Sequence, residues 1–154
     1  MNRELSPLER PDPCSFGASP RNLSAGKPVT ASQSLPGEPP EGAVDGGELA
    51  KWGAGAAPPQ WIEIDLGAPA TITEIALEVS QFPDGHTVHR VYGRGPSGPE
   101  QLLALLQGTT HDGEWLLAPK GAAAWTGIRF VRVETVESPS WVSWFEIEVI
   151  GVPG

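Results

Sequence analysis

The stretch Ile62-Glu63-Ile64-Asp65-Leu66 alternates apolar and acidic side chains with a period of two residues. That period is typical of a β-strand with one face in a core and one face in solvent, because successive side chains point to opposite faces. The same alternation returns at residues 75–79, where Ile75, Leu77 and Val79 are separated by Ala76 and Glu78. The two stretches predict two half-buried strands.

Further strands are predicted around this pair. Residues 88–92, 128–136 and 145–150 are rich in β-branched and aromatic side chains and are bounded by Gly, Pro, Ser or Asp. Short strands separated by frequent turn signals are typical of a β-sandwich or a β-barrel. The sequence therefore predicts an all-β fold.

One segment favours a different structure by composition. Residues 100–107 consist of strong helix formers, preceded by a proline and followed by a glycine. Eight residues make only a marginal helix, and a neighbouring strand can override local propensity. We expect a strand there, with a short helix as the alternative.

Composition and charge exclude several classes of function. The chain has 154 residues, with 39% hydrophobic residues, 19 glycines, 17 prolines and a net charge of −9. An acidic protein is a poor match for nucleic acid or anionic lipid, since both are bound mainly through Lys and Arg. No apolar run approaches the roughly 20 residues that cross a bilayer, so we expect no transmembrane segment. The single cysteine, Cys14, cannot form an internal disulfide.

The chain divides into a lead-in and one domain. Residues 1–21 contain four prolines and little apolar content, which predicts a flexible Pro-rich segment. Residues 22–154 form the predicted domain, long enough to bury a core of its own. Residues 1–7 lack the apolar core of a secretory signal peptide, and the sequence alone leaves the location open.

Two of the six tryptophans lie near the last predicted strand. Trp141 and Trp144 are three residues apart, so strand alternation would place them on opposite faces. Trp144 directly precedes the apolar strand, whereas Trp141 follows the turn Ser138-Pro139-Ser140. We therefore expect Trp144 in the core and Trp141 at the surface, where an aromatic ring can stack on a ligand.

Five ordered motifs resemble the discoidin family, which includes the C-terminal domains of coagulation factors V and VIII and the family 32 carbohydrate-binding modules. They are NLSAGKPVTAS at 22–32, AVDG at 43–46, QWIEIDLG at 60–67, ITEI at 72–75, and VRV at 131–133 with WVSWFEIEV at 141–149. The resemblance extends from about Asn22 to Gly151. It implies a discoidin-like (galactose-binding-domain-like) jelly-roll β-sandwich of about eight antiparallel strands in two sheets.

The resemblance also implies a structural calcium site that joins the Asp-Gly loop to the last strand. Its ligands would be the side chains of Asp45 and Glu146 and the main-chain oxygens of Gly42, Gly47, Ala50 and Phe145. Calcium accepts about six to eight oxygen ligands, and sodium would also be tolerated. Ala50 stands where many relatives have Thr or Ser, so we expect reduced affinity or an empty site. The alternative is that Asp45 caps a turn and Glu146 is a solvated strand residue.

In discoidin relatives the ligand surface is built from loops at one end of the sandwich. Here these loops would be residues 32–41, 81–89 and 138–141. The predicted ligand-binding residues are Trp141 as an aromatic platform, Phe82 beside it, and Gln81 and His86 as hydrogen-bonding groups. Gln81 stands about where sugar-binding relatives have an arginine, which argues against galactose specificity. For His86 a loop or strand histidine bonded to backbone is the favoured alternative to a ligand contact.

Catalysis is the rival class. Glu63 with Asp65, and Glu146 with Glu148, are carboxylate pairs that would lie about 7 Å apart on one strand face, a spacing that glycosidases use. Each pair is also explained as the solvated side of a strand. The sequence has no nucleophile elbow, no HExxH zinc motif and no phosphate-binding loop. We expect a protein that is not an enzyme.

Three classes of binding module follow from the resemblance. A carbohydrate-binding module is favoured, with a glycan or other cell-surface ligand as partner. A protein-interaction or cell-adhesion module using the same loops is the alternative. A lipid-headgroup binder is disfavoured by the charge of −9. The resemblance favours an extracellular or cell-surface location, and it is compatible with one module of a larger multidomain protein.

Overall fold

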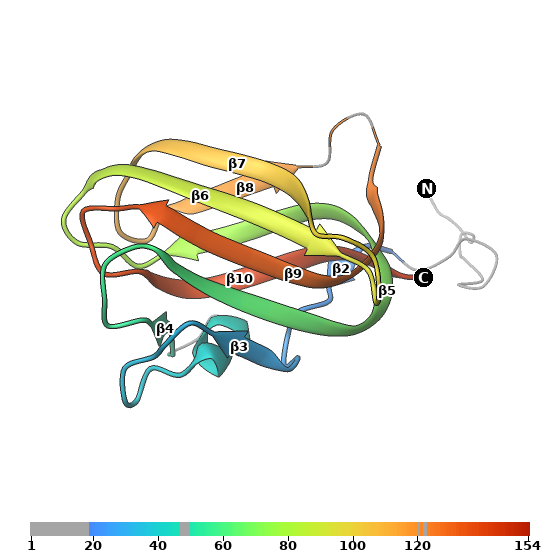
Figure 1. Ribbon diagram of the computed structural model, residues 1–154, viewed down its shortest axis with the longest axis horizontal. Helices are drawn as coiled ribbons and strands as arrows, with labels where there is room; N and C mark the ends of the chain where they lie inside the picture. Colours follow the sequence, from blue (N-terminus) through green and yellow to red (C-terminus); the bar gives the residue numbers. More distant parts are fainter. Residues whose placement is uncertain (1–18, 47–49, 120, 122) are drawn as a thin grey trace, which may run out of the picture.

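The computed structural model describes residues 19–46, 50–119, 121 and 123–154. These residues form nine β-strands and one short 3₁₀ helix (Figure 1). In chain order they are β2 (Arg21–Asn22), β3 (Val29–Ala31), η1 (Pro40–Val44), β4 (Trp52–Gly53), β5 (Gln60–Val79), β6 (Gly85–Arg94), β7 (Gln101–Thr110), β8 (Trp115–Pro119), β9 (Trp125–Glu137) and β10 (Ser143–Pro153). In the described ranges, no helix is long and apolar enough to cross a membrane.

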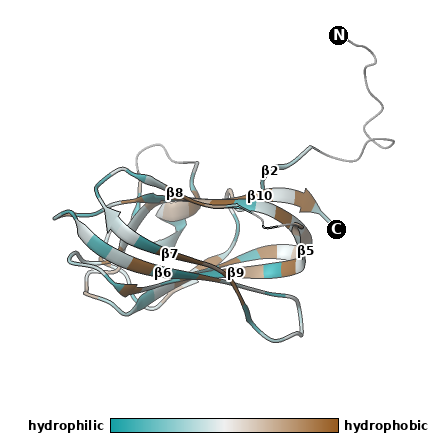
Figure 2. Ribbon diagram, turned by 90° about the horizontal axis from the view of Figure 1, so that it is seen from above, coloured by the Kyte–Doolittle hydropathy of each residue, from teal (hydrophilic) through white to brown (hydrophobic). Residues whose placement is uncertain are grey.

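The strands form two facing layers joined through β5. The strand order is β2-β10-β5-β9-β6-β7, with β3 and β8 also paired to β5 and β4 paired to β10. Figure 2 shows β2, β8 and β10 in one layer and β6, β7 and β9 in the other. Each of these pairings is antiparallel. The predicted all-β sandwich of antiparallel strands is confirmed, with its two layers continuous through β5.

Strand β5 passes from one layer to the other. Its first part pairs with β3 and β9, and its last part pairs with β10 and β8. The pairing with β9 shifts register between Asp65 and Ala70, and Gly67 in this stretch has φ 91°. A positive φ favours glycine, which has no Cβ to clash with the backbone. The bend at Gly67 lets both alternating stretches face the same core.

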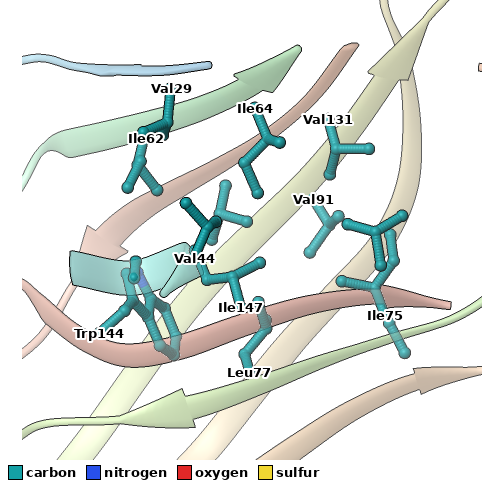
Figure 3. Close-up of a cluster of buried hydrophobic side chains, with 14 of the residues drawn as sticks. Val29, Val44, Ile62, Ile64, Ile75, Leu77, Val91, Val131, Trp144 and Ile147 are labelled. Atoms are coloured by element: carbon teal, nitrogen blue, oxygen red, sulfur yellow. The ribbon is translucent and has the colours of Figure 1, made fainter. Parts of the chain in front are cut away.

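The core lies between the two layers and contains the apolar positions predicted from the alternation. Ile62, Ile64, Ile75 and Leu77 are fully buried, and β9 and β10 contribute further aliphatic side chains (Figure 3). Trp144 is 1% exposed and lies in this cluster. Burial of such side chains is the main favourable term in folding.

The segment with helical composition is a strand, as we expected. It forms most of β7, which pairs with β6 in antiparallel register. Leu103, Ala104 and Leu106 pack against the core from this strand. Pairing and burial along β6 therefore override the helix propensity of these residues.

The amino-terminal boundary is described only in part. Residues 1–18, with Cys14, lie outside the described residues, so the predicted flexible lead-in over 1–21 stays a prediction. Arg21 and Asn22 form β2 and pair with Gly151 and Ile150 of β10. This pairing places the two ends of the described domain side by side (Figure 1).

Candidate functional site

A pocket of about 610 Å³ lies at one end of the sandwich. Its wall is formed by residues 80–82 after β5, by Asp112 between β7 and β8, and by residues 139–143 at the start of β10. Leu35 and Glu38, with β4 and its flanks, complete the lining. The connections that carry these residues meet at the left end of Figure 1. The fold thus brings five separate segments of the chain to one site.

Hydrogen bonds and close packing hold the connections together. The Phe82 backbone N–H donates to Ser140 Oγ at 3.2 Å, which joins the connection after β5 to the one before β10. The Gln81 backbone N–H donates to Asp112 Oδ1 at 2.9 Å. A Cβ at position 85 would lie only 2.7 Å from Pro139 Cγ, so glycine allows the two loops to approach. These contacts between the connections therefore hold the pocket wall in place.

Two exposed aromatic side chains line the pocket. Trp141 is 59% exposed and Phe82 is 87% exposed. The predicted division between a buried Trp144 and an exposed Trp141 is confirmed. Large exposed aromatic rings beside a pocket offer apolar surface to a ligand.

Three charged side chains also line the pocket, namely Glu38, Lys51 and Asp112. Lys51 Nζ donates to Ser80 Oγ at 3.3 Å and lies 5.6 Å from the centre of the Phe145 ring. None of these three residues was among the ligand-binding residues predicted from the sequence. Glu38 falls within the predicted ligand loop at 32–41, but no local pattern distinguishes it from its neighbours there.

Gln81 lies in the pocket wall, but its side chain bonds to the protein. The side chain is buried, and its amide nitrogen donates to Thr110 O at 3.1 Å and to Pro83 O at 3.2 Å. Its Oε1 accepts a hydrogen bond from Thr110 Oγ1 at 2.6 Å. These bonds indicate that the Gln81 side chain stabilises the loop and does not bind a ligand.

His86 lies apart from this pocket. The pocket lining includes Gln81, Phe82 and Trp141 but not His86. His86 is on β6, where its Nδ1 lies 2.8 Å from Glu137 Oε2 of β9. The structure thus brings together three of the four predicted ligand residues.

Glu146 is the most unusual acidic side chain in the described part of the protein. It is 1% exposed, and its Oε1 has no hydrogen-bond partner among the described residues. Its Oε2 accepts a hydrogen bond from the Gly46 backbone N–H at 3.3 Å. Burial raises the pKa of Glu146 to about 8, and the nearby Asp45 contributes to the rise. The alternative in which Glu146 is a solvated strand residue is wrong.

The surroundings of Glu146 fit a cation bound by oxygen. The helix η1 packs against β10, which brings the Asp45-Gly46 turn to Glu146. Two neighbouring carboxylates with one unpartnered buried oxygen are a donor set that Ca²⁺ accepts. Across the described ranges, no group of three or more His, Cys, Asp or Glu side chains could hold a metal, so main-chain oxygens would have to complete the site.

The other predicted cation ligands are placed as follows. Gly42 is buried in η1, and Phe145 precedes Glu146 on β10. Ala50 is exposed, and Gly47 lies outside the described residues. A Cβ at position 42 would overlap with the backbone carbonyl of Lys51, so this turn requires glycine for its close approach.

The carboxylate pair on β5 is engaged with arginines. Glu63 Oε1 lies 3.5 Å from an Arg94 nitrogen and Oε2 lies 3.4 Å from Arg132 Nε. Both oxygens of Asp65 accept hydrogen bonds from Arg129, at 2.8 and 3.1 Å, and these bonds lower the pKa of Asp65. Neither carboxylate lines the pocket.

The geometry agrees with the family and structural comparisons. The model of the F5/8 type C domain matches residues 28–92, from just before β3 into β6. Residues 28–92 therefore match the discoidin family model. This matched segment contains Glu38, Asp45 and Lys51, whereas Trp141 lies in the connection just before β10 and Glu146 lies on β10. No curated protein sequence matches the chain.

Solved structures extend the likeness over most of the chain. The family 32 carbohydrate-binding module of C. perfringens NanJ, solved with galactose, has a TM-score of 0.71 and 17% identity, covering 85% of this chain and 98% of that chain. Chitosan-binding module 2 of the chitosanase/glucanase from Paenibacillus sp. IK-5 was solved with chitotriose. Its TM-score is 0.69 at 27% identity, and the match covers 83% of this chain and 98% of that chain.

A third similar structure is a fucose-binding module of Streptococcus pneumoniae. Its TM-score is 0.69 at 21% identity, with coverage of 85% of this chain and 95% of that chain. At identities of 17% and 21%, the C. perfringens and S. pneumoniae modules establish the shared fold alone. The same sandwich fold is therefore shared by modules that were named for, or solved with, different sugars.

Proposed function

We propose that this discoidin domain is a non-catalytic carbohydrate-binding module that holds its glycan in the pocket around Trp141. The observation that supports the proposal is the pairing of exposed Trp141 and Phe82 beside a pocket of about 610 Å³. A sugar ring has an apolar C–H face that stacks on aromatic rings and hydroxyls that bond to polar groups. Ser80, Lys51 and Asp112 are polar groups in the same lining.

The similar structures support this class of ligand. The modules from C. perfringens, Paenibacillus and S. pneumoniae are named for carbohydrate or chitosan binding, or were solved with a sugar. We infer a glycan partner for this chain and no reaction at the pocket. The engagement of Glu63 and Asp65 by arginines supports a structural part for those carboxylates.

A glycan array tests the proposed function. The wild-type domain should bind at least one class of immobilised glycan, and Trp141→Ala should weaken that binding by at least about fivefold, because stacking contributes about 1 kcal/mol. Affinity for the best glycan is then measured by calorimetry.

Trp115→Ala is the matched control for that experiment. Trp115 on β8 is also exposed, at 43%, but it does not line this pocket. The control should bind like the wild type. Binding that survives Trp141→Ala and is lost in Trp115→Ala would contradict the proposed site.

We further propose that Asp45 and Glu146 hold a structural calcium ion, with main-chain oxygens of the adjoining turn and of Phe145. The unpartnered Glu146 Oε1 supports this assignment. The ion would supply positive charge between the two carboxylates and link η1 to β10. Ala50 contributes no side-chain oxygen, so we expect modest affinity.

Calcium should therefore stabilise the domain. A ligand bound only by the native state, present at ten times its Kd, adds about 1.4 kcal/mol to the free energy of unfolding. Thermal unfolding should show a higher Tm with calcium than with chelator, and Asp45→Ala should remove the difference. Asp84→Ala, which deletes an exposed carboxylate elsewhere, should retain it. Equal Tm values with calcium and with chelator in the wild type would contradict the site.

A further inference from the structure

Glu38 occupies an unusual position in the wall of the pocket. Its backbone carbonyl accepts a hydrogen bond from Gly53 N–H at 3.2 Å, and Leu35 N–H donates to Gly53 O at 2.8 Å. These bonds fix residues 35–38 alongside β4. A Cβ at position 53 would overlap with Glu38 Oε1, so the Glu38 carboxylate can lie here only because residue 53 is a glycine.

The Glu38 carboxylate has no partner within the described part of the chain. Neither of its oxygens takes part in a hydrogen bond or an ion pair there, although the residue is half-buried and lines the pocket. Lys51, the one cation in this lining, donates to Ser80 Oγ instead. Asp112 adds a second carboxylate, so the lining has an excess of negative charge.

We propose that the pocket recognises a glycan that carries a protonated amino group, with Glu38 as the acceptor for that ammonium. This inference rests on the proposed carbohydrate-binding function and names the class of sugar, an amino sugar whose nitrogen is not acetylated. A carboxylate without a partner gains a charge-assisted hydrogen bond from an ammonium, which is stronger than one between neutral groups. Trp141 and Phe82 provide the apolar surface for the sugar ring.

The charges argue against an acidic sugar in the same place. A uronic acid would bring a carboxylate toward Glu38 and Asp112, and like charges repel. Lys51 could oppose that repulsion only by exchanging its bond to Ser80 for one to the ligand. The net charge of −9 on the chain further disfavours an anionic ligand and favours a cationic one.

Calorimetry with two probes tests the inference. The glucosamine trisaccharide is compared with its N-acetylated counterpart at a mildly acid pH, where the free amine is protonated. The wild type should bind the glucosamine form about tenfold more tightly, because hydrogen bonds to charged groups are the stronger ones. Glu38→Gln should reduce the ratio of the two dissociation constants to near one, and added salt should reduce it in the wild type.

Two further variants distinguish the position of the Glu38 carboxylate from the mere presence of a negative charge nearby. Gly53→Ala keeps the Glu38 carboxylate but displaces its flexible end, and it too should lower the ratio. Glu41→Gln removes the same charge from an exposed residue three positions away that does not line the pocket, and it should keep the wild-type ratio.

The outcomes distinguish this inference from the proposed function. Equal binding of the two trisaccharides, a preference that persists in Glu38→Gln, or tighter binding of a uronic acid trisaccharide would overturn the amino-sugar assignment. If a neutral glycan still binds in a Trp141-dependent way, the carbohydrate-binding function stands while the amino-sugar assignment fails. If no glycan on the array binds through Trp141, the proposed function itself fails.

Discussion

Trp144→Ala should lower the free energy of unfolding by about 3–5 kcal/mol, the cost typical of deleting a large buried aromatic side chain. Trp144 is 1% exposed, belongs to the core cluster between the two layers, and packs edge-on against His89 with ring centroids 4.8 Å apart. Its Nε1 has no hydrogen-bond partner among the described residues, so the expected loss comes from packing and the cavity left behind.

Urea denaturation of the two variants Trp144→Ala and Trp141→Ala measures this contrast. Trp141 is 59% exposed, so its removal should change stability by less than about 1 kcal/mol. If Trp144→Ala does not give a folded protein, Trp144→Phe should fold and show a smaller loss. A large loss in Trp141→Ala with little change in Trp144→Ala would contradict the assignment of the two rings.

Acid should destabilise the domain through His89, which is buried in β6. Burial lowers the pKa of His89 to about 4 from an ordinary value of 6.5. The unfolded chain therefore binds a proton at pH values where the native state does not. The histidine's contribution is present above pH 6.5 and is lost progressively as pH falls toward 4, where the loss reaches about 3 kcal/mol.

The surroundings of His89 explain why protonation is disfavoured. Its Nδ1 lies 2.8 Å from Thr135 Oγ1 of β9, and its Nε2 has no partner among the described residues. Leu106 stands opposite it on β7, and the ring meets Trp144 of β10. None of these three neighbours carries a charge that could stabilise an imidazolium.

Denaturation of wild type and His89→Gln across this pH range isolates the effect, because the carboxylates titrate in both proteins. As the pH falls below 6.5, the unfolding free energy of the wild type should decrease more than that of His89→Gln. A difference that stays constant with pH would contradict the buried neutral histidine. Thr135→Val, which removes the hydroxyl but leaves the histidine, should retain a pH dependence of the same sign.

The alternation in β5 was sufficient to predict half-buried strands, because a period of two depends directly on which face is buried. With the turn signals it predicted a sandwich or a barrel, and the resemblance to the discoidin family decided for the sandwich. The assignment of Trp141 and Trp144 also followed from alternation, since it depended only on their spacing and on the turn at Pro139. For residues 100–107, local propensity favoured helix, and the strand was the better prediction because pairing with β6 decides the structure.

The site was less predictable because it depends on contacts between distant segments. Glu38 reaches the pocket only through its backbone pairing with Gly53, and Asp112 through its bond to Gln81. No local pattern indicates either contact. Gln81 was chosen for its hydrogen-bonding capacity, but the sequence does not reveal that Thr110 and Pro83 use that capacity.

The central claim is that the glycan binds at Trp141, and the indole N–H resonances of the tryptophans test it most directly. The isotopically labelled wild-type domain is titrated with its best glycan from the array and followed by NMR. Trp141 on the pocket should shift strongly, together with the amides of residues 138–143, while exposed Trp115 on β8 should not. A shift at Trp115 and the surrounding β7–β8 residues, with Trp141 unchanged, would contradict the account.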